Sequence, residues 1–273
     1  MNYRHAFHAG NFADLIKHAA LVLVMERLLA RDEPLRVVDT HSGRGIYDVG
    51  NADASRSGEA KAGIGRLANA TGLPAGLEIL RSDMEALNPV GVVSIYPGSP
   101  QLIASRLRAG DSYLACELRT EEHSALAESM RGRAGVKTAC ADGFDRASSL
   151  GQAEGQTLVL IDPPFERADD YARITEVLRS AGRRAPALRF LIWLPLKDLE
   201  TLDSFLRSIE DAELGPILVA EARMRPLMDP MKMNGCALVL VRPIDGIEDS
   251  IREVVEWVVG NLGESGEARL WRL

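Results

Sequence analysis

The residues with the clearest potential for chemistry are Asp162-Pro163-Pro164-Phe165, which directly follow the apolar run 158–161. A short run of this composition predicts a strand that is buried on both faces, in the middle of a parallel sheet. Two consecutive prolines cannot continue a strand ladder, so the strand must end there. Because ligands of open α/β sheets bind at the carboxyl ends of the strands, we expect a functional site at this edge.

Two further features are expected at the same edge. Gly43 and Gly45 lie in a turn that follows the predicted strand 35–41, and glycines there let the backbone approach a ligand closely. Short glycine-rich turns also follow many strands that bind nothing, so the turn alone leaves both interpretations open. Glu117, near the end of the predicted strand 112–118, is the type of residue that accepts hydrogen bonds from ribose hydroxyls in such folds.

Some polar residues have both a structural and a functional interpretation. Ser99 is expected to cap a helix that continues through residue 107, and a helix N-terminus at this edge can also bind an anion. Thr120 is expected to cap a helix over 120–131. Asp142 follows a predicted strand, where it is either a ligand contact or the cap of the next short helix. The sequence leaves these alternatives open.

The first 18 residues are rich in basic and imidazole side chains. Asn11 is expected to cap a helix that continues through residue 29, with Asp14 in its first turn favouring the helix dipole. Lys17 and His18 then lie one turn into this helix. A histidine in such a place is either a solvated side chain or a functional one.

The alternation of predicted strands and helices indicates a doubly wound α/β fold. Residues 46–95 interrupt this alternation with predicted helices over 57–69 and 75–88, which suggests a helical insertion after the first strand. We therefore expect a single domain over 1–273, with a seven-stranded, mostly parallel sheet and 46–95 as an insertion subdomain. Strands are predicted at 35–41, 112–118, 136–141, 157–161, 189–196, 216–224 and 236–242, with a short tail strand at 268–273.

Composition narrows the function classes. A net charge of -7 argues against a protein that coats nucleic acid non-specifically, although a local basic face can still bind RNA. Cys116, Cys140 and Cys236 have no metal-ligand or disulfide spacing, which favours a reducing compartment. The chain has neither a signal-peptide core nor a run approaching the roughly 20 apolar residues of a membrane span, so we expect a cytoplasmic protein.

The motifs resemble those of a known family. Asp-Pro-Pro-Phe is similar to the [DNS]-P-P-[YFW] motif of class I amino methyltransferases, which use S-adenosylmethionine. A closer resemblance, to the RlmJ family, covers essentially the whole chain and includes YRHAFHAGNFADLIKH, DTHSGRGIY, YPGSP, CELR, ADGF and IDPPF. Members of that family methylate N6 of one adenosine in bacterial 23S ribosomal RNA. The N-terminal signature is specific because generic methyltransferases lack it.

The resemblance implies roles for individual residues. Asp162 would be the catalytic carboxylate, and Tyr3, His5 and Lys17 match family positions implicated in catalysis, gating or RNA contact. Glu117 would hold the ribose of S-adenosylmethionine, and Asp142 and Gly143 would meet its adenine. Pro163 and Phe165 would contact the substrate; Phe165 replaces a frequent tyrosine, which preserves stacking but removes any role for a phenol hydroxyl. The contacts to S-adenosylmethionine would be His18, His41, Ser99, Glu117, Asp142, Gly143 and Asp162.

The tetrapeptide suits the chemistry of an aromatic amine. The exocyclic amine of adenine is a poor nucleophile because its lone pair is delocalised into the ring. Acceptors for both N–H groups turn that lone pair toward the methyl donor, and the Asp162 carboxylate and the Pro163 carbonyl are such acceptors. The reaction requires orientation and electrostatics, and we expect no metal. Either Asp162 or solvent takes the released proton.

Other functions use the same tetrapeptide. A DNA adenine or cytosine methyltransferase is one, although no DNA-reading module is recognisable. A protein glutamine methyltransferase is another, and a catalytically silent subunit that binds S-adenosylmethionine or RNA is a third, although a silent subunit has no need of Asp162. We expect a monomer that acts on 23S RNA, protein-free or in an early assembly precursor. RNA contacts are expected at Arg4, His5, His8, Lys17 and Arg44 and, further away, at Arg183, Arg184, Arg223, Arg225 and Lys232.

Overall fold

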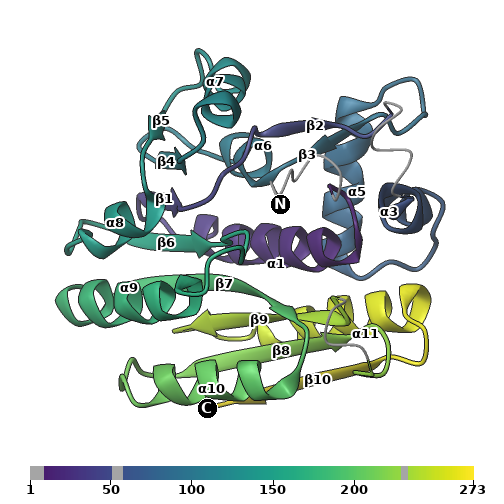
Figure 1. The fold of residues 1–273 in the computed structure, drawn as a ribbon. Helices are drawn as coiled ribbons and strands as arrows, with labels where there is room; N and C mark the ends of the chain where they lie inside the picture. Colours follow the sequence, from purple (N-terminus) through teal and green to yellow (C-terminus); the bar gives the residue numbers. More distant parts are fainter. Residues whose placement is uncertain (1–8, 51–57, 229–232) are drawn as a thin grey trace.

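The computed structural model describes residues 9–50, 58–228 and 233–273. An eight-stranded sheet runs through this part of the chain, and helices cover both of its faces (Figure 1). The strands follow the order β10-β8-β9-β7-β6-β1-β4-β5. They are β1 (Leu35–Asp39), β4 (Ser112–Glu117), β5 (Val136–Cys140), β6 (Gln156–Ile161), β7 (Leu188–Leu196), β8 (Ile217–Arg223), β9 (Gly235–Val241) and β10 (Glu267–Arg272).

The predicted doubly wound α/β fold is confirmed. All pairings from β7 to β5 are parallel, and all pairings from β7 outward to β10 are antiparallel. The sheet has eight strands rather than seven because the tail strand β10 pairs with β8 along its whole length.

Strand β6 lies near the middle of the sheet and carries the motif of interest at its end. Its six residues are all buried, and it pairs in parallel with β1 on one side and β7 on the other. Leu158 and Leu160 point into the core on one face, whereas Val159 and Ile161 point into the core on the other. The strand ends at Ile161 because Pro163 and Pro164 have no N–H group to donate to a neighbouring strand.

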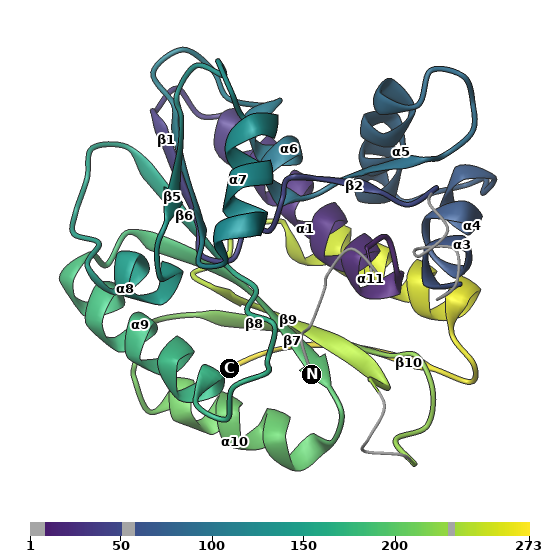
Figure 2. The same ribbon diagram turned by 45° about the horizontal axis from the view of Figure 1, so that its top comes forward.

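Two groups of helices cover the sheet (Figure 2). One core lies between the sheet and α1, α5, α6, α7 and α11, and the other lies between the sheet and α8, α9 and α10. The helix bounds are α1 (Phe12–Leu29), α3 (Glu59–Ala62), α4 (Ile64–Ala68), α5 (Ala75–Leu87), α6 (Ser99–Ala104), α7 (Thr120–Ser129), α8 (Gly143–Ser148), α9 (Asp170–Arg184), α10 (Leu199–Glu210) and α11 (Glu248–Leu262).

Of the caps predicted at Asn11, Ser99 and Thr120, the first is confirmed and the other two are wrong. The side chain of Asn11 caps α1 and accepts hydrogen bonds from the backbone N–H groups of Ala13 and Asp14. Helices α6 and α7 instead have Gly98 and Arg119 as their N-caps, without a side-chain hydrogen bond. Ser99 is unavailable as a cap because its hydroxyl donates to a buried carboxylate of β1, and α6 ends at Ala104, before the predicted residue 107.

The predicted helix over 57–69 is also wrong, since α3 and α4 are two short helices that break at Gly63. A Cβ at Gly63 would lie 2.1 Å from the carbonyl oxygen of Gly10, so the two backbones pack directly against each other. The N–H of Ile64 donates to that same carbonyl at 3.0 Å. The break therefore anchors this segment to the beginning of α1.

The segment between β1 and α6 contains more than helices. Strands β2 (Ile46–Asp48) and β3 (Ile95–Pro97) pair antiparallel at its two ends, and α3, α4 and α5 lie between them along the chain. Helix α5 packs against α1 and α11. The division into one domain with a 46–95 insertion subdomain remains a prediction. Across the described ranges, no helix is both long and apolar enough to span a membrane.

Candidate active site

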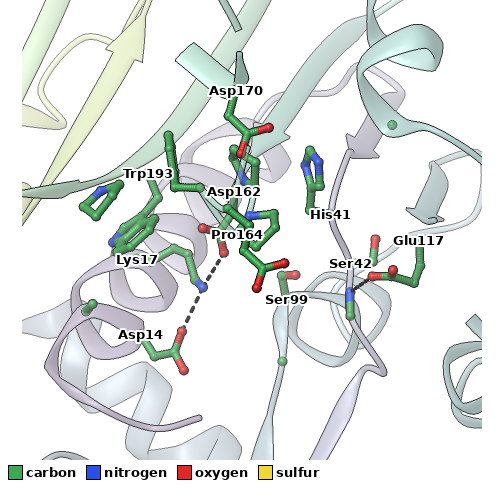
Figure 3. A pocket seen from close by; sticks show the side chains of 18 of the residues that line it. Asp14, Lys17, His41, Ser42, Ser99, Glu117, Asp162, Pro164, Asp170 and Trp193 are labelled. Atoms are coloured by element: carbon green, nitrogen blue, oxygen red, sulfur yellow. Dashed lines mark hydrogen bonds and ion pairs between the residues drawn. The ribbon is translucent and has the colours of Figure 1, made fainter. Parts of the chain in front are cut away.

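A cavity of about 750 Å³ opens at the carboxyl edge of the parallel strands. Its walls come from the ends of β4, β1, β6 and β7 and from the first two turns of α1 (Figure 3). The predicted site residues that line this cavity are Lys17, His18, His41, Ser99, Glu117, Asp142, Gly143, Asp162, Pro163 and Phe165. Tyr3 and His5, like Arg4 and His8, lie outside the described residues. The structure thus gathers segments from both halves of the chain around one space.

A buried ammonium group lies between two carboxylates on one side of the cavity. The Nζ atom of Lys17 is 2.6 Å from Oδ2 of Asp162 and 2.8 Å from Oδ1 of Asp14 (Figure 3). The side chains of Lys17 and Asp14 are only 6% and 4% exposed. Burial alone would lower the pKa of Lys17, but the attraction of Asp14 and Asp162 outweighs burial and holds this pKa well above its usual value. Lys17 is therefore a cation at neutral pH.

Aromatic rings line the cavity beside this cation. The ring centroid of Phe165 lies 4.9 Å from that of Tyr171 and 5.9 Å from that of Trp193, and Nζ of Lys17 lies 6.0 Å from the Trp193 ring. Phe165 has a φ of 51°, a left-handed conformation that is uncommon for a bulky residue. Backbone strain of this kind concentrates at functional sites, where the surrounding structure enforces it. Trp193 was missed at the level of sequence because it lies within an apolar stretch of β7, between Ile192 and Leu194.

The opposite side of the cavity is built around Glu117. One carboxylate oxygen accepts from the N–H of Gly43 at 3.0 Å and the other from the N–H of Arg119 at 2.8 Å. Burial raises the pKa of Glu117, and these two hydrogen bonds oppose the rise. Gly43 has a φ of +62°, and a Cβ there would lie 2.1 Å from the hydroxyl of Tyr47. The glycine-rich turn therefore packs tightly and orients the acidic side chain.

His41 and Phe144 form a second part of this wall. Their ring centroids are 4.7 Å apart in an edge-to-face arrangement, and Nδ1 of His41 lies 2.8 Å from Oγ1 of Thr40. Burial lowers the pKa of His41 to about 4; Asp142 opposes this shift and Arg173 adds to it. The imidazole is therefore neutral at physiological pH.

Asp142 does act as a helix cap. Its Oδ1 accepts from the backbone N–H groups of Phe144 and Asp145, and its two oxygens pair with Arg173 at 2.9 and 3.0 Å. Burial would raise the pKa of Asp142, but Arg173 outweighs burial and lowers it. Its neighbour Gly143 packs on the backbone directly after β1, where a Cβ would lie 1.9 Å from the carbonyl oxygen of Thr40. The cap also lines the cavity, so the structural role does not remove Asp142 from the site.

Three buried polar contacts hold the cavity residues His18 and Ser99 and their neighbour Asp39. Nδ1 of His18 lies 2.7 Å from the hydroxyl of Tyr96. The carboxylate of Asp39, which is fully buried, accepts from the hydroxyls of Ser99 at 2.7 Å and Tyr113 at 3.2 Å. Burial raises the pKa of Asp39 to about 6. Asp39 was missed as a site residue, although it begins the Asp-x-x-x-Gly-x-Gly pattern that includes the glycine-rich turn.

Arg44 donates to the Glu122 carboxylate from Nε at 2.9 Å and from Nη2 at 2.8 Å, and its contact with RNA remains a prediction. Cys116 and Cys236 are buried and Cys140 is exposed. Within 9–50, 58–228 and 233–273, no cluster of three or more His, Cys, Asp or Glu side chains is arranged to hold a metal ion.

The strand order and the site at the carboxyl edge define a Rossmann-like class I methyltransferase. The family model described as "Ribosomal RNA large subunit methyltransferase D, RlmJ" matches residues 32–273, and the chain belongs to this family. The family predicted from the N-terminal signature and the other motifs is thereby confirmed.

Individual relatives agree with this assignment. A Haemophilus influenzae protein named ribosomal RNA large subunit methyltransferase J is 31% identical, over 97% of this chain and 95% of that protein. An Escherichia coli protein of the same name is 30% identical over the same shares of the two chains. A solved structure of a Legionella pneumophila protein is 28% identical, has a TM-score of 0.89, and the match covers 97% of this chain and 98% of that one.

Proposed function

We propose that this chain transfers a methyl group from S-adenosylmethionine to N6 of a specific adenosine in 23S ribosomal RNA. The observation that carries the proposal is the position of Asp162 and Pro163, which line the cavity directly after β6, with Lys17 paired to the Asp162 carboxylate. The two named relatives are large-subunit ribosomal RNA methyltransferases, which supports the choice of acceptor.

The Glu117 side of the cavity has the chemistry that an adenosyl group requires. Glu117 offers a carboxylate at the end of β4, where ribose hydroxyls can donate to it. Leu118 lines the same wall and is 58% exposed, which leaves an apolar surface for a flat base. S-adenosylmethionine, when bound, supplies a methyl group that is already activated on a sulfonium. We infer that S-adenosylmethionine is also contacted by His18, His41, Ser99, Asp142 and Gly143.

The Asp162 side has the chemistry that an amine requires. Lys17 holds Oδ2 of Asp162, and among the described residues no group is bonded to Oδ1. Oδ1 is therefore available to accept one N–H of the amine, and the Pro163 carbonyl to accept the other. This arrangement directs the nitrogen lone pair toward the methyl group. The nitrogen then releases one proton, which Asp162 or solvent accepts.

The aromatic wall supports an adenine that has left its stack. Phe165 and Trp193 both line the cavity with their ring centroids 5.9 Å apart, and a planar base can stack against such rings. Extruding the base from RNA costs about a few kcal/mol, which stacking in the pocket offsets. We further propose that the acceptor is RNA free of protein or in an early assembly precursor, and that the enzyme acts as a monomer.

The test is transfer of a labelled methyl group to protein-free 23S RNA, with digestion to nucleosides. N6-methyladenosine is the expected product. Parallel reactions contain DNA or protein in place of RNA. Label that appears only in DNA or only in protein glutamine would favour the other amine acceptors. Donor binding without any transfer would favour a catalytically silent subunit.

Replacing Asp162 tests the mechanism with the largest expected effect. In Asp162→Asn, kcat should fall by about 10²- to 10⁴-fold, the range typical of a lost carboxylate in proton transfer and orientation. Binding of S-adenosylmethionine, measured by calorimetry, should stay within about threefold because its expected contacts lie mainly on the other wall. Undiminished turnover would remove Asp162 from the mechanism.

A further inference from the structure

Asp14 has a role at the site that the sequence did not indicate beyond its favourable position in the first turn of α1. Its Oδ1 pairs with Lys17 at 2.8 Å, and its Oδ2 accepts from the backbone N–H of Gly10 at 2.8 Å. The side chain is 4% exposed and lines the cavity. Because both oxygens have fixed partners, the carboxylate has a fixed orientation.

We propose that Asp14 is a positioning residue for methyl transfer, which acts through the ammonium of Lys17 to fix the carboxylate of Asp162. The inference rests on the proposed function. Asp14 touches neither donor nor acceptor in this account, and no bond to it forms or breaks during the reaction. Its task is to keep Lys17 charged and in place, so that Oδ2 of Asp162 stays occupied and Oδ1 faces the amine.

The charges around Lys17 explain why one carboxylate is not sufficient. A buried ammonium loses the stabilisation of water, and a second anion compensates for part of this loss. When an amine N–H donates to Asp162, that carboxylate shares its charge with the new donor and attracts Lys17 less. Asp14 lies on the opposite side of Nζ and continues to hold it. Without Asp14, both the lysine and Asp162 would be free to adopt other rotamers.

The other groups near Lys17 do not replace Asp14. Tyr47 on β2 and Tyr96 on β3 are neutral because burial raises the pKa of each phenol, and burial raises the pKa of the Cys236 thiol on β9 to about 12. Trp193 on β7 offers only the face of its ring, at 6.0 Å. Glu59 on α3 lines the cavity and accepts a hydrogen bond from the side chain of Asn11.

The decisive variant is Asp14→Asn, which removes the charge but keeps an oxygen for the N–H of Gly10. We expect kcat for RNA methylation to fall by about 10- to 100-fold, a usual cost of misplacing a reacting group. The KM values for S-adenosylmethionine and RNA should stay within about twofold of the unmodified protein. Asp14→Glu restores the charge and should recover part of the lost turnover.

The pH profile distinguishes positioning through Lys17 from a merely structural role. The kcat of the unmodified protein should stay level up to about pH 9.5, because Asp14 and Asp162 hold the pKa of Lys17 well above its usual value near 10.4. In Asp14→Asn the burial of Lys17 is opposed by one carboxylate only, so its pKa falls and kcat should decline within that range. Asp14→Glu should keep the level profile.

Asp249→Asn is the matched control, because Asp249 occupies the first turn of α11 and lies outside the cavity. It reports the loss of a carboxylate at a helix N-terminus and should leave kcat and its pH profile unchanged. An unchanged kcat in Asp14→Asn would overturn the role of Asp14. So would a lowered kcat that stays level up to about pH 9.5, as in the unmodified protein. Absence of RNA methylation by the unmodified protein would instead contradict the proposed function itself.

Discussion

The two walls of the cavity are built differently. The Glu117 wall consists of side chains whose orientation is set by neighbouring backbone N–H groups and by a helix cap, all at the ends of strands. The Asp162 wall depends on α1. This helix carries Lys17, whose ammonium contacts Asp162 at the end of β6, 145 residues further along the chain. The first wall therefore depends on strand ends and on helices α8 and α9, whereas the second requires the N-terminal helix to dock correctly.

From this difference we expect the Glu117 wall to bind the methyl donor and the Asp162 wall to support turnover. Among the described residues the Glu117 wall holds no lysine, and Glu117 and Asp142 already accept from backbone N–H groups and from Arg173, which suits a stable site for a ligand used in every cycle. The Asp162 wall contains a charged cluster and a residue with left-handed backbone, which suits selection and orientation of an acceptor. Variants on one wall should thus leave the function of the other wall intact.

The largest effect in this comparison is expected at Glu117. Glu117→Ala should weaken S-adenosylmethionine binding by about 10- to 100-fold, since hydrogen bonds to a charged group contribute about 1.5–3 kcal/mol. Calorimetry with the free protein measures this, and the KM for RNA should not change. Glu128→Gln on α7, an exposed carboxylate outside the cavity, is the matched control. Loss of RNA affinity without loss of donor affinity would contradict the assignment of the two walls.

An intermediate effect is expected at Trp193. Trp193→Ala should lower kcat/KM for RNA by about tenfold, because stacking of a base on an aromatic ring contributes about 1–3 kcal/mol. Trp193→Phe keeps an aromatic ring and should retain most of the kcat/KM. Donor affinity should be preserved. Trp271→Ala on β10 removes a partly buried indole outside the cavity and controls for general destabilisation. If Trp193→Ala instead weakened binding of S-adenosylmethionine, the Trp193 ring would belong to the Glu117 wall.

The smallest effect is expected at Lys197, which follows β7 and lines the cavity. Lys197 is exposed, and within the described ranges its ammonium has no ion-pair partner. If it contacts an RNA phosphate, Lys197→Gln should reduce the slope of log K against log salt by about one. Lys137→Gln on β5 removes another exposed lysine, outside the cavity, and is the control. Equal slopes in the two variants would exclude a phosphate contact at Lys197.

Much of the fold was predictable because its strands are short apolar runs that end in turn residues. The position of β6 followed from its composition and from the two prolines after Asp162. Gly63 and Ser99 were not predictable, because the backbone of Gly10 forces the break at Gly63 and buried Asp39 draws Ser99 away from capping. Both outcomes depend on partners far away in the sequence.

The same reasoning explains which site residues were found. Residues at strand ends were predicted because the edge of a parallel sheet gathers them regardless of helix packing. The i,i+3 spacing of Asp14 and Lys17 was visible in the sequence and consistent with an ion pair on α1. The resemblance predicted that Lys17 belongs to the same site as Asp162, but the ion pair between them could not be derived from spacing, because it depends on how α1 packs on the sheet. Trp193 carried no local signal within an apolar strand.

The most direct test of the central claim is a map of N6-methyladenosine in 23S ribosomal RNA from cells with this enzyme, without it, and with the Asp162→Asn variant in its place. We expect one adenosine to be methylated with the enzyme present, and the same adenosine to be unmodified in its absence and with the variant. A map of N6-methyladenosine in 23S RNA that is the same in all three samples would contradict the proposed reaction.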